Sequence, residues 1–297
     1  MATLKEVKTK ISAVKKTRQI TKAMNMVAAS KLRGAQSDME GFRPYSGKFE
    51  EVLGSLLEKV DEDVSPLVIP REEVNKIHLV LCTSDRGLCG GFNSNLILKV
   101  GSFIKDRSEG EVEFSFTNFG KKGRNWCRNN NYTIISEHLG VVGAKFKFNV
   151  AAISGRQLIE GFQNESYDEV YLVYSEFVSM ARQVPVLKQI LPIPALEVAE
   201  DEVEDEEKPY LAEHICEPSL EELVGEMLPK SVYIQLYGAL LETSTSEHAA
   251  RMTAMDNATT ACNEMLENLT LVYNKARQAA ITAELMDIVG GAEALSG

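Results

Sequence analysis

Apolar residues near the N-terminus recur in alternating steps of three and four, the spacing of a coiled-coil seam. The repeat is regular through Leu4, Val7, Ile11 and Val14. It then becomes less regular, because Thr17, Arg18 and Thr21 interrupt the apolar stripe. The next apolar positions are Ile20, Met24, Val27, Ala28 and Leu32. This pattern predicts one long helix over residues 3–58.

A stricter three-four repeat occupies the C-terminal segment. It passes through Met252, Met255, Thr259, Cys262, Leu266, Leu269, Tyr273, Ala276, Ala280 and Ala283. No proline follows Pro229, and Gly290 with Gly291 forms a natural helix stop. We therefore predict a helix over residues 231–289, about 90 Å long at the usual rise per residue.

A helix of that length needs a second long helix to cover its seam, because a domain of ordinary diameter is too small. The N-terminal segment is the candidate partner, and the two would form an antiparallel coiled coil.

The middle of the chain alternates short strand patterns with helical ones. Strands are expected at 76–82, 113–118, 132–136 and 169–177, and helices at 96–107, 121–129 and 149–162. Such alternation predicts a mostly parallel sheet that is covered on both faces. The predicted fold class is α/β, with a long antiparallel coiled coil of N- and C-terminal helices and an inserted Rossmann-like α/β domain. The expected domains are 1–60, 61–229 and 230–297.

Composition is that of a folded protein, but charge is distributed unevenly. The 297 residues are 44% hydrophobic and 25% charged, with a net charge of −11. Residues 1–33 carry nine Lys or Arg and one acid, whereas residues 197–208 carry eight acids and one Lys. The basic arm favours an acidic protein partner over nucleic acid, because no helix-turn-helix signal is present and the whole chain is acidic.

Catalytic and metal-binding patterns are missing from the sequence. The five Cys and four His are scattered, without CxxC or paired spacing. The turn TSDRGLCGGFNSN after the first strand lacks both GxxxxGK[ST] and GxGxxG. We expect no cofactor, no metal and no catalytic residue. Two alternatives stay open: an α/β enzyme that binds a small phosphorylated ligand at residues 83–91, and a cytoskeletal or nucleic-acid-packing coiled coil.

Three stretches resemble the γ-subunit family of bacterial F-type ATP synthases. They are ITKAMNMVAASKLRGAQ (20–36), TSDRGLCGGFNSNL (83–96) and the C-terminal stretch 246–295, which begins SEHAARMTAM. The resemblance covers the whole chain. It implies a non-catalytic rotor of the central stalk that couples proton translocation by the membrane c-ring to ATP synthesis or hydrolysis in an α3β3 hexamer. The implied partners are the α and β subunits, the ε subunit and the c-ring.

The resemblance also implies roles for particular residues. Contact with the β subunit or coupling is expected for Met24, Lys31, Arg33, Leu88, Arg251, Arg277, Gln278, Thr282 and Glu284. Contact with the c-ring and ε is expected for Tyr210, Glu213 and Glu217. Neither a signal peptide nor a span of about 20 apolar residues is evident. The expected location is therefore the cytoplasmic face of a bacterial inner membrane, as a peripheral protein held by its partners.

Overall fold

The computed structural model describes residues 4–59, 65–107, 112–194 and 219–296. The chain divides into two compact units, of which unit 1 comprises 1–29 with 251–297 and unit 2 comprises 30–250. Two long helices, α1 (Leu4–Leu57) and α5 (Leu220–Ser296), each contribute to both units. The predicted helices at the two ends of the chain are confirmed, although the bounds of α5 differ from those expected.

Unit 2 contains one mixed sheet with the strand order β3-β2-β1-β4-β5. Strands β1 (Lys76–Cys82), β2 (Glu113–Phe119), β3 (Thr133–His138) and β4 (Glu169–Phe177) are parallel, as predicted. The prediction missed β5 (Gln183–Leu191), which runs antiparallel to β4. Most residues of β5 are half-buried and one of them is Pro185, so the segment gives a weak strand signal. β5 lies at the edge of the sheet, and an edge strand tolerates a proline that an inner strand does not.

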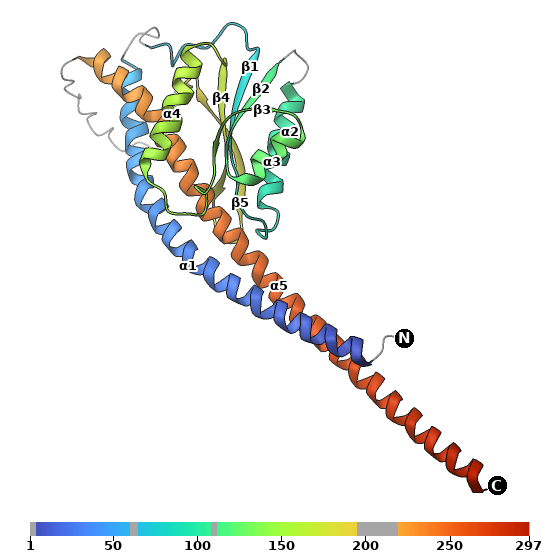
Figure 1. The fold of residues 1–297 in the computed structure, drawn as a ribbon. Helices are drawn as coiled ribbons and strands as arrows, with labels where there is room; N and C mark the ends of the chain where they lie inside the picture. Colours follow the sequence, from blue (N-terminus) through green and yellow to red (C-terminus); the bar gives the residue numbers. More distant parts are fainter. Residues whose placement is uncertain (1–3, 60–64, 108–111, 195–218, 297) are drawn as a thin grey trace, which may run out of the picture. The chain divides into compact units, whose positions relative to one another are not determined.

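Helices cover both faces of this sheet (Figure 1). Helices α2 (Phe92–Arg107) and α3 (Lys121–Asn129) pack on one face, where Ile77, Leu79 and Leu81 of β1 join their core. The alternate residues Val80 and Cys82 belong to a second core on the other face. The alternation follows from the two-residue period of a strand.

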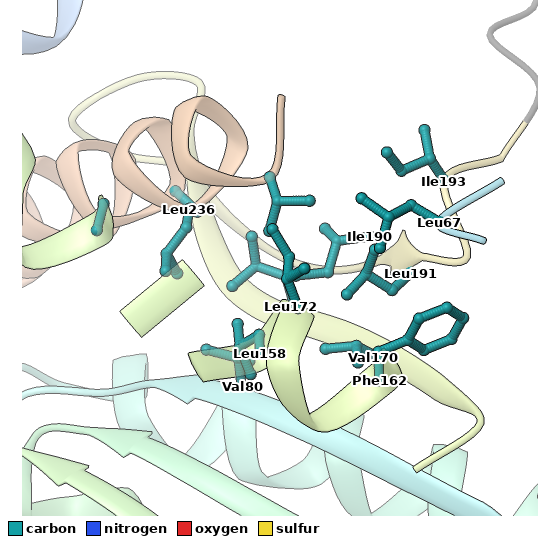
Figure 2. Packing of buried hydrophobic residues seen from close by; sticks show 14 of the residues in the cluster. Leu67, Val80, Leu158, Phe162, Val170, Leu172, Ile190, Leu191, Ile193 and Leu236 are labelled. Atoms are coloured by element: carbon teal, nitrogen blue, oxygen red, sulfur yellow. The ribbon is translucent and has the colours of Figure 1, made fainter. Parts of the chain in front are cut away.

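The second core is built by α4 (Phe148–Gln163) and by the unit 2 segments of α1 and α5. Figure 2 shows Leu158 and Phe162 of α4 and Leu236 of α5 in the same cluster as the strand residues Val80, Val170 and Leu172. The neutral ring of His78 is buried on this face, with Nδ1 2.8 Å from Ser115 Oγ and Nε2 2.9 Å from Thr117 Oγ1.

Helix α5 begins eleven residues before the predicted start at 231. The prediction placed too much weight on Pro229, which lies inside the helix. Val224, Leu228 and Val232 are fully buried at helical spacing in the second core, and this packing offsets the hydrogen bond that a proline removes. The predicted stop at Gly290 and Gly291 was also wrong, because the helix continues to Ser296. A glycine lowers helix stability by only about 1 kcal/mol and does not by itself end a helix.

The described part of unit 1 is an antiparallel pair made by the start of α1 and the end of α5. Arg18 Nη1 donates to Asn263 Oδ1 (3.2 Å), Thr21 Oγ1 lies 2.8 Å from Thr259 Oγ1, and Asn25 Nδ2 donates to the Met252 carbonyl (2.9 Å). As the residue number rises in one helix it falls in the other, which confirms the antiparallel pairing.

These contacts correct the predicted seam of α1. The regular repeat that begins at Leu4 continues through Arg18, Thr21, Asn25 and Ala28, all buried or half-buried. Ile20 and Val27 are 60% and 58% exposed, so their placement in the seam was wrong. The prediction selected the apolar residues and did not continue the three-four repeat. In the structure polar side chains occupy the next seam positions and form hydrogen bonds between the two helices.

The predicted seam of α5 is confirmed from Met252 to Ala280, where each of its residues is buried or half-buried. Ala283 is exposed, and so is every residue from Ile281 to Ala292. Leu4 stands fourteen residues before Arg18, so its counterpart lies near Arg277, fourteen residues after Asn263. Beyond that level the described part of α1 offers no residue to cover α5, and Figure 1 shows α5 continuing alone.

Candidate partner-binding surface

The uncovered end of α5 carries an apolar stripe. Ile281, Leu285 and Ile288 are 47%, 57% and 67% exposed and recur at helical spacing, which places them on one side of the helix. We call these three residues the C-terminal apolar face. A contiguous apolar surface that the described chain leaves exposed is typical of a protein–protein contact.

The predicted contact residues near this end lie together. Arg277, Gln278, Thr282 and Glu284 are all exposed within about two turns of α5. Thr282 Oγ1 donates to the Gln278 backbone carbonyl (3.0 Å), and residue Gln278 is itself exposed. Arg277 and Glu284 are seven residues apart and share one side of the helix. The group therefore offers charged and amide groups beside the C-terminal apolar face.

Two further predicted residues, Met24 and Arg251, lie at the other end of the unit 1 helix pair. Because Asn25 donates to the Met252 carbonyl, the neighbouring residues Met24 and Arg251 lie at the same level of the pair. Both are half-buried. Met24 follows Ile20 and precedes Val27 at helical spacing, so it belongs to an outward stripe and not to the seam.

The remaining predicted contacts fall in unit 2. Lys31 and Arg33 are exposed on α1, and Leu88 is exposed in the turn between β1 and α2. Tyr210, Glu213 and Glu217 lie outside the described residues.

The glycine-rich turn at 83–91 does not form a phosphate cradle. Ser84 N–H donates to Asn93 Oδ1 (3.0 Å) and Ser84 Oγ donates to the Arg86 carbonyl (2.5 Å). The carboxylate of Asp85 accepts the N–H groups of Lys121 (3.1 Å) and Gly140 (2.8 Å). The polar groups of the turn are thus used to hold the loops at this edge of the sheet together.

The crevice where such a sheet would bind a ligand is also filled. In doubly wound sheets that crevice lies beyond the carboxyl ends of the strands, where the order reverses, which here is between β1 and β4. α5 occupies it with a buried polar segment, residues 243–248. Ser246 Oγ donates to the Ser175 carbonyl (3.1 Å), and Ser175 N–H donates to Thr243 Oγ1 (3.5 Å). Because this segment of α5 fills the crevice, it argues against the alternative of a phosphorylated ligand at the turn.

Burial shifts the pKa of several His and Cys groups of unit 2 in the direction that favours their neutral forms. Desolvation lowers the pKa of His78 to about 3 and raises the pKa of Cys127 to about 11. It also raises the pKa of the Cys82 thiol far above its usual value. Neutral thiols are poor nucleophiles, so these groups are suited to packing. Within the described ranges no three metal-ligating side chains gather, and no helix is long and apolar enough to cross a membrane.

Two features of the structure were not predicted from the sequence. One is the polar seam of Arg18, Thr21 and Asn25, which continued counting of the repeat from Leu4 would have found. The other is Asn93, whose side chain contacts both Ser84 and Cys89. No spacing signal marks it.

These features define a partner-binding α/β protein with a long helix pair. Residues 3–295 match the family described as ATP synthase. The ATP synthase gamma chain of Desulfosudis oleivorans is 64% identical over 298 residues, and that of Desulforapulum autotrophicum is 60% identical over 299, each covering 100% of both chains. The chain belongs to the ATP synthase gamma chain family, and its role is that of a non-catalytic subunit of the central stalk.

Solved structures agree with this assignment. The central stalk and c-ring structure of the Tetrahymena thermophila mitochondrial ATP synthase contains a chain with a TM-score of 0.58 and 28% identity. That match covers 80% of this chain and 99% of the other. A chain of the Euglena gracilis mitochondrial ATP synthase rotor has a TM-score of 0.63 at 18% identity, covering 94% and 98%, and shows the same fold.

Proposed function

We propose that this central-stalk subunit transmits rotation between a proton-driven c-ring and an α3β3 catalytic hexamer, with ε as a further partner. The observation that carries the proposal is the C-terminal apolar face. It stands on a helix that the described chain leaves uncovered, beside a compact group of charged and amide side chains. A surface of this kind needs a surrounding partner to cover it.

Each group of predicted contact residues has its own role in this proposal. Arg277, Gln278, Thr282 and Glu284 contact the catalytic subunits beside the C-terminal apolar face. Met24 and Arg251 act at the other end of the same helix pair, and Lys31, Arg33 and Leu88 contact the β subunit from unit 2. The subunit would bind the open and closed conformations of the β subunits unequally, depending on its rotation angle.

Further parts of the proposal concern organisation and location. The functional divisions are 1–60, 61–229 and 230–297, and Tyr210, Glu213 and Glu217 contact the c-ring and ε. The protein works at the cytoplasmic face of the bacterial inner membrane and is held there by its partners. Hydrogen ion transport belongs to the complex and not to this chain.

Single-molecule imaging of the purified complex tests the proposal. The chain is co-expressed with the α and β subunits of the same organism and labelled at an engineered cysteine in unit 2. ATP-driven rotation in one direction, in three main steps, is expected. A stable complex that does not rotate would reduce the claim to a binding subunit, and no complex with folded α and β would overturn it.

A further inference from the structure

Leu88 has an unusual backbone for an apolar residue. Its φ of 65° lies in the left-handed region, which costs free energy for any residue with a Cβ. The other non-glycine residues of the described chain with positive φ, Asn131 and Glu165, follow the ends of α3 and α4, where a left-handed residue is common. Leu88 precedes a helix, so helix termination does not explain its conformation.

The side chain of Leu88 gains little from the rest of the chain. It is 64% exposed, whereas the next residue, Cys89, is buried. A position that combines a left-handed backbone with an exposed leucine costs stability twice, and Asn or Gly would avoid both costs. Strain that the surrounding structure maintains is a signal of function.

Asn93, in the first turn of α2, holds the two ends of this turn. Its Oδ1 accepts the Ser84 N–H (3.0 Å), and its Nδ2 donates to Ser84 Oγ (2.8 Å) and to Cys89 Sγ (3.1 Å). One side chain thus joins residues 84 and 89 and closes the loop that contains Leu88. Asp85 adds a second brace through the N–H groups of Lys121 and Gly140.

Basic residues lie near the turn that carries the exposed leucine. Arg86, Lys121 and Lys122 are all exposed, and Lys122 Nζ lies 3.8 Å from the position that a Cβ on Gly87 would take. The carboxylate of Asp85 is occupied by two backbone N–H groups. The turn therefore offers one exposed apolar side chain beside basic residues, which complements an apolar site flanked by carboxylates.

We propose that Asn93 is a positioning residue that holds Leu88 in its left-handed conformation and presents it to a carboxylate-flanked apolar site on the α3β3 hexamer. The inference rests on the proposed function, which supplies the hexamer as the partner. By fixing the turn before contact, Asn93 reduces the conformational entropy that binding would otherwise cost.

A double-mutant cycle on the chain with purified α3β3 hexamer tests this. Leu88→Ala and Asn93→Ala are each expected to weaken binding of the chain about 5- to 10-fold. The double variant is expected to bind no more weakly than Leu88→Ala alone, because Asn93 acts through Leu88. Leu98→Ala is the matched control, since Leu98 is also a leucine of unit 2 and is 67% exposed in regular helix. Asn95→Ala is the control for Asn93, and neither control should change binding.

Each contrary result has a distinct meaning. If Asn93→Ala weakens binding equally whether Leu88 is kept or replaced by alanine, Asn93 is a structural residue and the inference fails. If Leu88→Ala binds like Leu98→Ala while the unaltered chain binds and rotates, Leu88 is no contact and only the inference fails. If the unaltered chain does not bind the hexamer, both the inference and the proposed function fail. Should Asn93→Ala fail to fold, Asn93→Asp keeps the acceptor for Ser84 and loses the donor to Cys89, and the same cycle applies.

Discussion

Thr21 and Thr259 face each other across the helix pair of unit 1, with 2.8 Å between their hydroxyl oxygens. Both occupy seam positions that a coiled coil normally fills with apolar side chains. Each hydroxyl oxygen also lies near a carbonyl of its own helix, Thr21 Oγ1 at 3.1 Å from the Arg18 carbonyl and Thr259 Oγ1 at 2.8 Å from the Met255 carbonyl. Because a hydroxyl has one proton, one threonine donates across the pair and the other donates to its own helix. The Thr21–Thr259 contact therefore fixes the register of the two helices without leaving either hydroxyl unpaired.

Replacing both hydroxyls with methyl groups should stabilise the pair. The double variant Thr21→Val/Thr259→Val is expected to raise the melting temperature of the isolated chain by about 2 °C, because removing both partners at once leaves no unmet donor. Thermal unfolding followed by circular dichroism measures this. Each single variant should change the melting temperature less, and a clear fall for the double variant would show that the hydroxyl contact is worth more than apolar packing.

Two glycines inside helices should respond oppositely to alanine. A Cβ on Gly155 of α4 would collide with the ring of Tyr233 on α5, whereas a Cβ on Gly101 of α2 would meet open space. We expect Gly155→Ala to lower the free energy of unfolding by roughly 2 kcal/mol through overpacking. Gly101→Ala should raise it by about 0.5–1 kcal/mol through helix propensity. Urea titration of both variants decides the matter, and two effects of the same sign would contradict the packing at Gly155.

The free energy of unfolding should fall as the pH is lowered below the pKa of an ordinary histidine. Burial holds the pKa of His78 at about 3, and it lowers the pKa of His138 as well. Below the unfolded pKa of about 6.5 the unfolded chain binds a proton that the folded chain excludes. The stability that the buried neutral ring contributes is complete above the unfolded pKa and is lost as the pH falls toward the folded pKa. From pH 6.5 to 4.5, His78 alone should lower the free energy of unfolding by roughly 2 kcal/mol.

Urea unfolding at a series of pH values measures this slope. His78→Gln removes the titrating ring and should flatten the dependence over the same range, although it also removes the stacking of the His78 ring on Tyr167. An equal slope in both proteins would mean that other groups control the acid response.

Sequence patterns predicted most of this fold because its strands and long helices have regular apolar periods. The strand expected at 76–82 matches β1, and the seam from Met252 to Ala280 is the one observed. The errors occur where packing overrides a local signal. Pro229 lies in a helix because the buried residues around it stabilise that helix, and Thr21 lies in a seam because Thr259 faces it.

The contact surface was less accessible to such reasoning. The C-terminal apolar face depends on where α1 begins relative to α5, which is a property of the helix pair and not of either segment. The hydrogen bonds by which Asn93 joins residues 84 and 89 depend on the path of a turn, and the sequence indicates that turn only through its glycines. A hydrogen bond from an amide to a thiol leaves no periodic trace.

Met24→Lys should slow rotation while leaving assembly intact. Met24 is half-buried in the outward stripe between Ile20 and Val27, so a lysine there adds a charge at the proposed sliding contact and not in the seam. Met26→Lys is the matched control, because Met26 is 60% exposed and stands two residues away on a different side of the helix. Rotation speed and subunit stoichiometry of both complexes are the readouts. Failed assembly with normal rotation in the residual complex would make Met24 a packing residue.

The C-terminal apolar face should matter to the complex and not to the isolated chain. Its three side chains are exposed, so Ile281→Ser/Leu285→Ser/Ile288→Ser should leave the main thermal transition of the isolated chain unchanged. The same variant should bind the hexamer about 10-fold or more weakly, because partner burial of these side chains is lost. Ala279→Ser/Ala283→Ser alters exposed residues of the same segment outside the face and is the control. Normal binding by the triple variant would remove the face from the contact.

Hydrogen exchange provides an independent check on the same segment. In the isolated chain, amides of residues 281–292 should exchange much faster than those of 252–266, since no seam residue of the described chain covers them. Addition of the hexamer should slow exchange at 281–292 specifically, because binding couples the ordering of this segment to partner contact. Full protection of 281–292 before the hexamer is added would mean that the helix is stable without a partner. The exposed apolar side chains would then be a consequence of helix propensity and not a requirement for binding.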